Sequence, residues 1–217
     1  MPDSAIPALL QSYLDELVPD RPPELRGMEA KAAAEGFPII GPACGQVCYL
    51  IARLTGARRI FELGSGFGYS TAWFARALRE NGVEPGNGIV HHTVWDQDLS
   101  EQARRHLSAL GLADLVRFHC AEAVATLREQ TEPFDLIFSD IDKEGYPASL
   151  PVIEQRLRPG GVLLVDNMLW GNRIFDPAAD DEATEGVRGL TRMIAGSERW
   201  IGSILPIRDG LLLAMRR

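Results

Sequence analysis

The 217-residue chain has little cysteine, no long apolar run and no excess of basic residues. Its three cysteines, Cys44, Cys48 and Cys120, are an odd and low number, which argues against a disulfide framework. Cys44 and Cys48 would lie one turn apart on a predicted helix, with no nearby His and no second Cys pair. Buried, inert thiols are therefore favoured over a zinc site.

The chain also lacks a segment that approaches the roughly 20 apolar residues of a membrane span. Its first ten residues show neither the basic start nor the apolar run of a secretory signal, so we expect a cytoplasmic protein. Basic residues number 22 against 30 acidic ones, a net charge of -8, which argues against non-specific binding to nucleic acid or anionic membranes. With 46% hydrophobic residues, the chain can bury a sizeable core.

The apolar pattern divides the chain into two unequal parts. Residues 1–56 predict helices: one with Ser4 as a plausible cap, one over residues 24–35 that stops at Gly36, and one between Pro42 and Gly56. Residues 57–217 predict alternating strands and helices. We therefore expect one domain, 1–217, with a helical extension over 1–56 and a sheet core over 57–217.

Within the second part, five apolar strands are each followed by a helical segment, and two strands close the chain. Apolar strands between amphipathic helices indicate a doubly wound, Rossmann-like α/β fold with a mostly parallel sheet and helices on both faces. Ligands of such a sheet bind beyond the carboxyl ends of the strands. The predicted strands are Arg59–Leu63, Ile89–Trp95, Val116–Cys120, Phe134–Ser139, Val162–Val165, Trp200–Pro206 and Leu211–Arg216.

A glycine-rich loop follows the first predicted strand. Gly64, Gly66 and Gly68 have the spacing G-x-G-x-G. Ser65 lies between the first two glycines, and Ser70 follows the third. Glycine there allows a tight turn and a close approach of a ligand to the backbone, although the same glycines could serve only to shape a strand–helix turn. The dinucleotide fingerprint needs G-x-G-x-x-G, and no phosphate-binding G-x-x-x-x-G-K is present.

Acidic residues end the first two strands. Glu62 would repel a pyrophosphate but suit a ligand that carries an ammonium group. Asp96 could accept both hydroxyls of an adenosine ribose; Asp98 is the competing residue, but we expect Asp98 to cap the following helix. Ala123 follows the third strand, where the loop could edge an adenine.

Polar residues also follow the fourth and fifth strands. Asp140 ends one strand, and Asp166 and Asn167 end the next. Neighbouring parallel strands bring their carboxyl ends together, and two carboxylates with an amide oxygen suit Mg²⁺, Mn²⁺ or Ca²⁺ rather than zinc. Lys143 could face the same cavity and act as a base. The alternative is that Lys143 belongs to a solvated loop and Asp166 merely caps an element.

These residues resemble the metal-dependent catechol and caffeoyl-CoA type O-methyltransferases over roughly residues 37–217. The resemblance rests on Glu62–Ser70, Trp95-Asp96, Phe134–Tyr146, Pro159–Gly161, Asp166–Trp170 and Asp209-Gly210. It implies S-adenosylmethionine as cofactor and a seven-stranded sheet whose last strand is antiparallel. It also implies a divalent metal, most simply Mg²⁺, and a homodimer that acts on a small-molecule acceptor.

The resemblance further implies a role for each matched residue. Glu62, Gly64, Ser65, Gly66, Gly68 and Ser70 would hold the methionine part of the cofactor, Asp96 its ribose and Ala123 its adenine. Asp140, beside the cofactor, would ligate the metal with Asp166 and Asn167, Lys143 would be catalytic, and Trp170 would line the acceptor pocket. Glu122 stands where the family has a small or amide residue.

The implied reaction is methyl transfer to a hydroxyl, with a catechol-like acceptor as the first choice. The metal would orient two adjacent oxygens and lower the hydroxyl pKa. Lys143 would take the proton or stabilise the resulting anion. Two other hypotheses remain open: a nucleotide-dependent oxidoreductase, which the glycine spacing disfavours, and a non-catalytic cofactor-binding protein.

Overall fold

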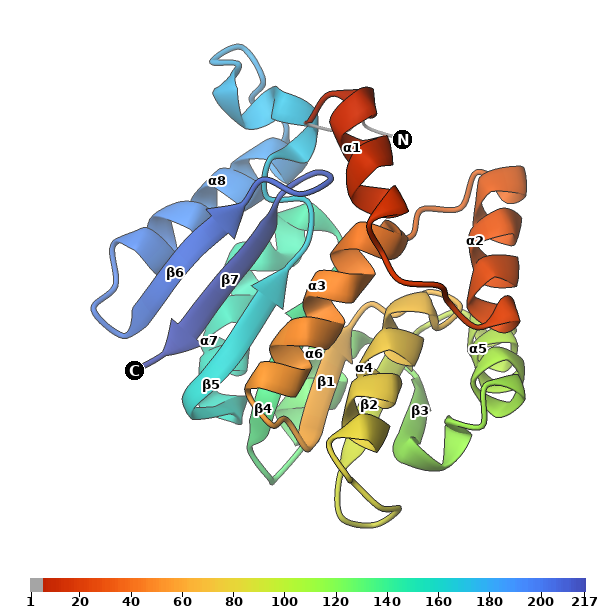
Figure 1. The fold of residues 1–217 in the computed structure, drawn as a ribbon. Helices are drawn as coiled ribbons and strands as arrows, with labels where there is room; N and C mark the ends of the chain where they lie inside the picture. Colours follow the sequence, from red (N-terminus) through yellow and green to blue (C-terminus); the bar gives the residue numbers. More distant parts are fainter. Residues whose placement is uncertain (1–5) are drawn as a thin grey trace.

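The computed structural model, described here for residues 6–217, contains one seven-stranded sheet in the order β3-β2-β1-β4-β5-β7-β6 (Figure 1). β1 to β5 pair in parallel, and β7 is antiparallel to both of its neighbours, as predicted. The strands are β1 (Arg59–Leu63), β2 (Ile89–Val94), β3 (Val116–Cys120), β4 (Phe134–Ser139), β5 (Leu157–Val165), β6 (Trp200–Leu205) and β7 (Leu211–Arg216).

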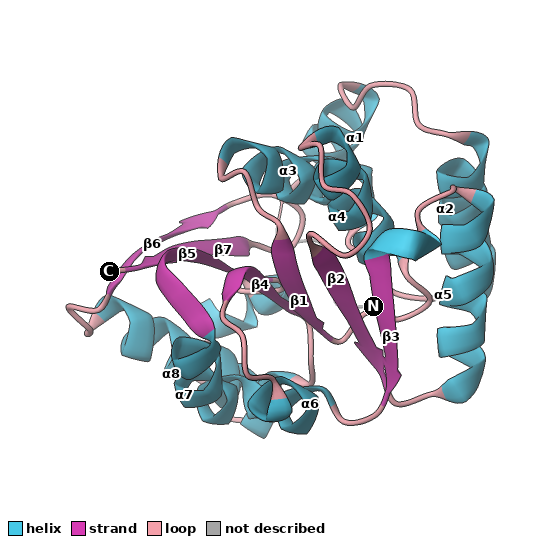
Figure 2. Ribbon diagram, turned by 90° about the horizontal axis from the view of Figure 1, so that it is seen from below, coloured by secondary structure: helices cyan, strands magenta, loops and turns pink. Residues whose placement is uncertain are grey.

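Helices cover both faces of this sheet (Figure 2). On one face lie α3 (Gly41–Leu54) and α4 (Tyr69–Glu80), with α1 (Ala8–Glu16), α2 (Pro23–Glu35) and α5 (Gln97–Ala109) beside them. On the other face lie α6 (Ala123–Glu129), α7 (Tyr146–Arg156) and α8 (Glu182–Ala195). The arrangement confirms the doubly wound α/β fold with helices on both faces.

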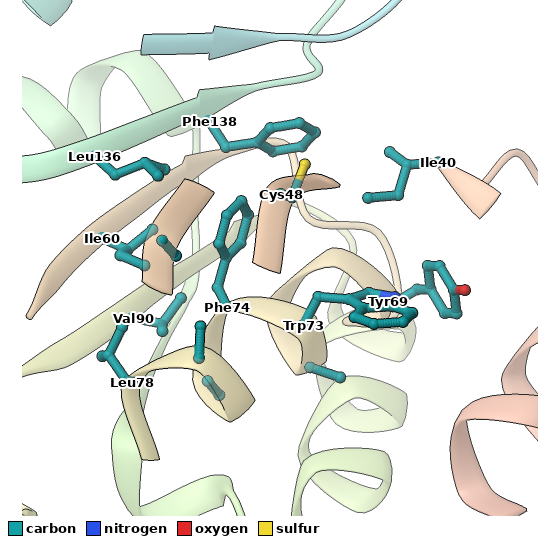
Figure 3. Close-up of a cluster of buried hydrophobic side chains, with 14 of the residues drawn as sticks. Ile40, Cys48, Ile60, Tyr69, Trp73, Phe74, Leu78, Val90, Leu136 and Phe138 are labelled. Atoms are coloured by element: carbon teal, nitrogen blue, oxygen red, sulfur yellow. The ribbon is translucent and has the colours of Figure 1, made fainter. Parts of the chain in front are cut away.

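Strand side chains alternate between two hydrophobic cores, one on each face. Ile60 points into the core under α3 and α4, while its neighbour Phe61 points into the core under α6 and α7; both are fully buried. In the first core Phe74 of α4 packs against Phe138 of β4, with Cys48 close by (Figure 3). Truncating such a buried Phe to Ala costs about 3–5 kcal/mol.

Cys44 and Cys48 agree with the expectation of buried thiols, whereas Cys120 is exposed. Cys44 and Cys48 are buried in α3, and burial together with their mutual contact raises the pKa of Cys44 well above its usual value. α3 also approaches α4 very closely at Gly45. A Cβ at this position would lie only 2.3 Å from the indole nitrogen of Trp73 in α4. Glycine at this position lets the two helices pack.

Three local expectations need correction. β5 begins at Leu157 rather than at Val162, because Leu157 already pairs with Phe134 before the ladder shifts register at the Pro-Gly-Gly segment. Asp96, and not Asp98, caps α5: its carboxylate accepts a hydrogen bond of 2.9 Å from the Leu99 amide. The first helix begins at Ala8, and the proposed cap Ser4 lies outside the described residues.

The strand order places three polar strand ends side by side. β4 lies between β1 and β5, and backbone hydrogen bonds continue past the ends of the strands. The Asp140 amide donates to Leu63 (2.8 Å), and the Asp166 amide donates to Ser139 (3.1 Å). The segments that carry Glu62, Asp140 and Asp166 are therefore held together by the sheet itself.

No helix in the part of the chain that the structure describes is long and apolar enough to cross a membrane.

Candidate active site

Two adjoining cavities open beyond the carboxyl ends of β1, β4 and β5. The first, of about 710 Å³, lies over the glycine loop and the ends of β2 and β3. The second, of about 700 Å³, lies over the ends of β4 and β5 and the turn between β6 and β7. Both walls include Asp140, Ile141 and Asp142, so Asp140 stands where the two cavities meet. A ligand in one cavity can therefore reach a ligand in the other.

The glycine loop forms one wall of the first cavity. Gly64, Ser65, Gly66 and Ser70 line it, and so does Ala123. Gly64 has φ +81°, and a Cβ there would lie 2.5 Å from the backbone oxygen of Asp140. Only glycine fits where this loop passes so close to the end of β4.

Gly68 has a different role from the one predicted for it. It is absent from the cavity wall, has φ +94° and precedes the first turn of α4. A Cβ at this position would lie 3.0 Å from side-chain atoms of Ala103 and Leu107 in α5. Gly68 therefore allows α5 to pack against the loop, and it does not itself face the cavity.

Glu62 lies fully buried behind the loop and not on the cavity wall. Its Oε2 accepts a hydrogen bond from Thr71, and the Thr71 hydroxyl oxygen lies 3.0 Å from Nδ1 of His92, which is also buried. Burial raises the pKa of Glu62 to about 7, although nearby hydroxyls of Ser70, Thr71 and Ser65 lower it. Glu62 Oε1 is buried without a hydrogen-bond partner among the described residues, which leaves one oxygen of the acid unsatisfied by the protein.

Asp96 is exposed and absent from both cavity walls, since its carboxylate caps α5. The capping hydrogen bond uses Oδ1 alone, and the contact of Asp96 with a ribose stays a prediction. Val94 and Trp95 line the first cavity at the end of β2 instead, and Trp95 is 85% exposed. Sequence reasoning missed Trp95, although an indole beside a glycine loop is a suitable platform for a flat ring.

Glu122 lines the same cavity from the end of β3. Its carboxylate caps α6 and accepts from the amides of Val124 (2.8 Å) and Ala125 (2.6 Å). Its carboxylate satisfies two amides in the first turn of α6 that have no partner within the helix. Glu122 therefore keeps Ala123 in place at the edge of the cavity.

Lys143 is the buried cation of the second cavity. Its Nζ donates to Asp140 Oδ1 (2.7 Å) and to the backbone oxygen of Ile141 (3.1 Å). The same nitrogen lies 5.1 Å from the ring centre of Tyr146 and 5.8 Å from that of Trp170. These contacts fix the ammonium at the junction of the cavities, and they overturn the alternative that Lys143 lies in a solvated loop.

Asp166 and Asn167 lie next to this cation, at the end of β5. Asp166 is 1% exposed, and Arg208 donates to its Oδ2 at 2.8 Å. Burial raises the pKa of Asp166, Arg208 lowers it, and Asp140 raises it again. Asn167 has φ +59° and donates from its amide nitrogen to Asp209 Oδ2 at 3.1 Å. The structure thus brings the predicted carboxylates and amide together and adds Arg208 and Asp209.

A hard divalent cation fits the chemistry of this donor set. Among residues 6–217 no three His, Cys, Asp or Glu side chains form a metal cluster, and the predicted set has only two carboxylates beside the amide of Asn167. Asp166 Oδ1 is buried without a hydrogen-bond partner in the described residues, which marks an oxygen still available to a cation. Such oxygen ligands suit Mg²⁺ or Mn²⁺ with water and substrate completing the coordination.

The histidines take no part in either cavity wall. His91 and His119 stack on each other, and Nε2 of His119 lies 3.0 Å from Nδ1 of His91. Burial lowers the pKa of His91 and of His92 to about 3, so both are neutral at pH 7. His91 and His92 are buried structural groups of β2.

Comparisons with known proteins agree with this geometry. Residues 21–217 match the model of a family described as O-methyltransferase. The chain is 29% identical over 214 residues to a catechol O-methyltransferase of Niastella koreensis. The alignment covers 94% of each of the two chains.

Among solved structures, an O-methyltransferase of Bacillus cereus in complex with SAH superposes with a TM-score of 0.85 at 27% identity, covering 96% of this chain and 97% of the other. The O-methyltransferase TomG of Streptomyces achromogenes, in complex with SAM, superposes with a TM-score of 0.82 at 30% identity and covers 96% of each chain.

Proposed function

The chain belongs to the O-methyltransferase family, and we propose that it moves the methyl group of S-adenosylmethionine to a hydroxyl of a small, catechol-like acceptor held by a divalent metal. One observation carries this proposal: two cavities of similar volume meet at Asp140. Methyl transfer needs the donor and the acceptor in line and in contact, and well-aligned partners gain up to about 7–11 kcal/mol.

The first cavity suits the cofactor. Solved relatives at 27% and 30% identity are described in complex with SAH and SAM. The loop around Gly64 and Gly66 allows a close backbone approach, and Glu62, with its unpartnered Oε1, would attract the ammonium of the methionine part. Trp95 and Ala123 would enclose the adenine, and Asp96, next to Trp95, would accept the hydroxyls of the ribose.

The second cavity suits the acceptor. Asp140, Asp166 and Asn167 would hold a metal, which would supply a Lewis acid that lowers the pKa of an acceptor hydroxyl. Lys143 Nζ, already a hydrogen-bond donor at 2.7 Å from Asp140, would take the hydroxyl proton or stabilise the oxygen anion. Trp170 would pack against the acceptor ring, and Asp209 would keep the Asn167 amide in position.

The helical extension over 1–56 would belong to the same domain as the sheet core over 57–217. In support, Phe37, Pro38, Ile39 and Ile40, which precede α3, line the first cavity. A homodimer would bury exposed apolar residues on α1 and α3: Leu9, Tyr13, Leu17, Leu50 and Leu54. Light scattering after gel filtration tests this; a monomer at micromolar concentration would exclude it.

The function is tested by incubating the protein with S-adenosylmethionine, Mg²⁺ and a panel of catechols, and by measuring S-adenosylhomocysteine with and without EDTA. We expect turnover that EDTA abolishes and Mg²⁺ restores. Turnover that resists EDTA would exclude the metal. Cofactor binding without turnover on any acceptor would favour a non-catalytic binding protein, and binding of NADH in place of S-adenosylmethionine would favour an oxidoreductase.

A further inference from the structure

Arg208 lies between Asp166 and the second cavity. Arg208 is part of the cavity wall, whereas Asp166, which it contacts at 2.8 Å, is 1% exposed and is not part of that wall. The guanidinium is itself mostly buried, with 18% of its side chain exposed. Any cation that enters the cavity and uses both oxygens of Asp166 must therefore meet Arg208 first.

The backbone around Arg208 holds it in this place. It lies in the tight turn that joins β6 to β7, where the Gly210 amide donates to Ile207 (2.8 Å), and it has φ +52°, which residues other than glycine rarely adopt. The next residue, Asp209, accepts from the Gly171 amide (2.6 Å) and from the Asn167 side chain. The Met168 and Leu169 amides donate to Gly210 and Asp209. The turn and the loop after β5 thus form one unit.

Arg208 places a positive charge where a metal ion on Asp166 would have to bind. Asp140, Asp166 and Asp209 carry negative charges beside Arg208 and Lys143. The wall of the second cavity also includes the acids Asp15, Asp142 and Glu144, so the positive charges that a divalent ion meets at Asp166 are those of Arg208 and Lys143. Because the group is largely removed from water, the unfavourable interaction between Arg208 and the ion is only partly screened.

We propose that Arg208 is a built-in counter-cation of the metal site: it neutralises Asp166 while no metal is bound and lowers the affinity of the site for a divalent ion. This inference rests on the proposed metal-assisted function. Arg208 acts as a positioning residue, because it sets how Asp166 is presented to the ion. If Arg208 only supported the structure, replacing it would weaken metal binding by the protein. If it is a counter-cation, replacing it should strengthen metal binding.

The test measures Mn²⁺ binding to the full chain by electron paramagnetic resonance, with no cofactor or acceptor present. We expect Arg208→Gln to bind Mn²⁺ at least tenfold more tightly than the unchanged protein. In EDTA the melting temperature of Arg208→Gln should lie below that of the unchanged protein. On adding Mn²⁺ it should rise by more than that of the unchanged protein. Arg199→Gln, which removes an exposed arginine paired with Glu154, is the matched control and should leave both quantities unchanged.

Equal or weaker Mn²⁺ binding by a folded Arg208→Gln would overturn the proposal. If that variant does not fold, Arg208→Lys decides: its shorter side chain should reach Asp166 less well and give an intermediate gain in affinity, and no gain would overturn the proposal. If none of the proteins binds Mn²⁺ at millimolar concentration, the counter-cation and the metal both fail, while retained S-adenosylmethionine binding would show that the methyltransferase assignment survives.

Discussion

The Thr71 hydroxyl donates a hydrogen bond to the buried carboxylate of Glu62. This contact joins the first turn of α4 to the end of β1, directly behind the glycine loop. His92 Nδ1 lies 3.0 Å from the same hydroxyl, so the threonine is held from both sides and its proton is directed at the acid. The charge state of Glu62 thus depends on a fully buried residue that is part of neither cavity wall.

Thr71→Val should weaken binding of S-adenosylhomocysteine about tenfold. Valine keeps the shape of threonine but removes a hydrogen bond to a charged group, which contributes about 1.5–3 kcal/mol. Without it the ionised form of Glu62 is harder to maintain. Isothermal titration calorimetry measures the effect. Thr191→Val, which removes a hydroxyl bonded to a backbone oxygen of α8, is the control and should bind normally; equal losses in both variants would contradict this role.

Cofactor affinity should depend on pH because the pKa of Glu62 is raised to about 7, chiefly by burial. An ammonium prefers the ionised carboxylate, so affinity should decrease by up to tenfold per pH unit below pH 7. It should fall again above pH 8, since a free α-amino group loses its proton at about 7.7–8.0. Dissociation constants measured from pH 5 to 9 would show a maximum between 7 and 8. A constant affinity between pH 5.5 and 7 would rule out Glu62.

The same raised pKa predicts that Glu62→Gln stabilises the ligand-free protein. In the unfolded chain Glu titrates near 4.5, so the folded state binds more protons between pH 4.5 and 7, and stability falls as pH rises through that window. At pH 8 the unchanged protein carries a buried charge that glutamine lacks. Thermal unfolding at pH 8 should show a gain on the order of 1–3 kcal/mol, and the gain should vanish near pH 4. Loss of stability at pH 8 would contradict it.

Two lysine substitutions should separate the two roles of Lys143. Lys143 would act either as a base or as a stabiliser of the oxygen anion. Lys143→Met should lower kcat about 100-fold or more for both roles, because each needs the side-chain nitrogen. Lys143→Arg keeps the charge but cannot act as a base, so it should retain much more activity only if the lysine stabilises an anion. The chain has one other lysine, Lys31, paired with Glu35 in α2, and Lys31→Met is the natural control.

Two tryptophans should report separately on the two cavities. Trp170→Ala should raise KM for the acceptor about tenfold and leave cofactor binding unchanged, because Trp170 lines only the second cavity. Trp95→Ala should have the opposite effect, since Trp95 lines only the first. Stacking on an aromatic side chain contributes about 1–3 kcal/mol per base, so either loss should be measurable by steady-state kinetics and calorimetry. If both variants changed the KM for the acceptor and the affinity for the cofactor equally, the assignment of one cavity to each ligand would be wrong.

The sequence predicted those parts of the site that follow directly from strand ends. Glu62, Asp140 and Asp166 each close a strand, and parallel strands necessarily bring such ends together. Lys143 could be placed beside Asp140 because three residues of chain cannot separate them far. The seven strands followed from the apolar pattern, whereas the antiparallel last strand followed from the family resemblance.

Other features depend on contacts that sequence spacing does not reveal. Arg208 and Asp209 reach Asp166 and Asn167 across 42 residues, and only the pairing of β5 with β7 brings them there. Asp98 was expected to cap α5, but the helix begins at Gln97, so Asp96 is the residue in the capping position. Trp95 was predicted as the last residue of a strand, and a tryptophan there is equally consistent with a core position.

The junction between the β6–β7 turn and the loop after β5 has a consequence for how the protein matures during synthesis. The glycine loop and its supporting strands are complete once β4 has been made, but Asn167 gains its partner only when Asp209 has been added. β7 also adds Leu211 to one core and Leu212 to the other, so neither cavity should reach its final form before the last hairpin has been made. The protein should therefore become able to transfer a methyl group only at the very end of its synthesis.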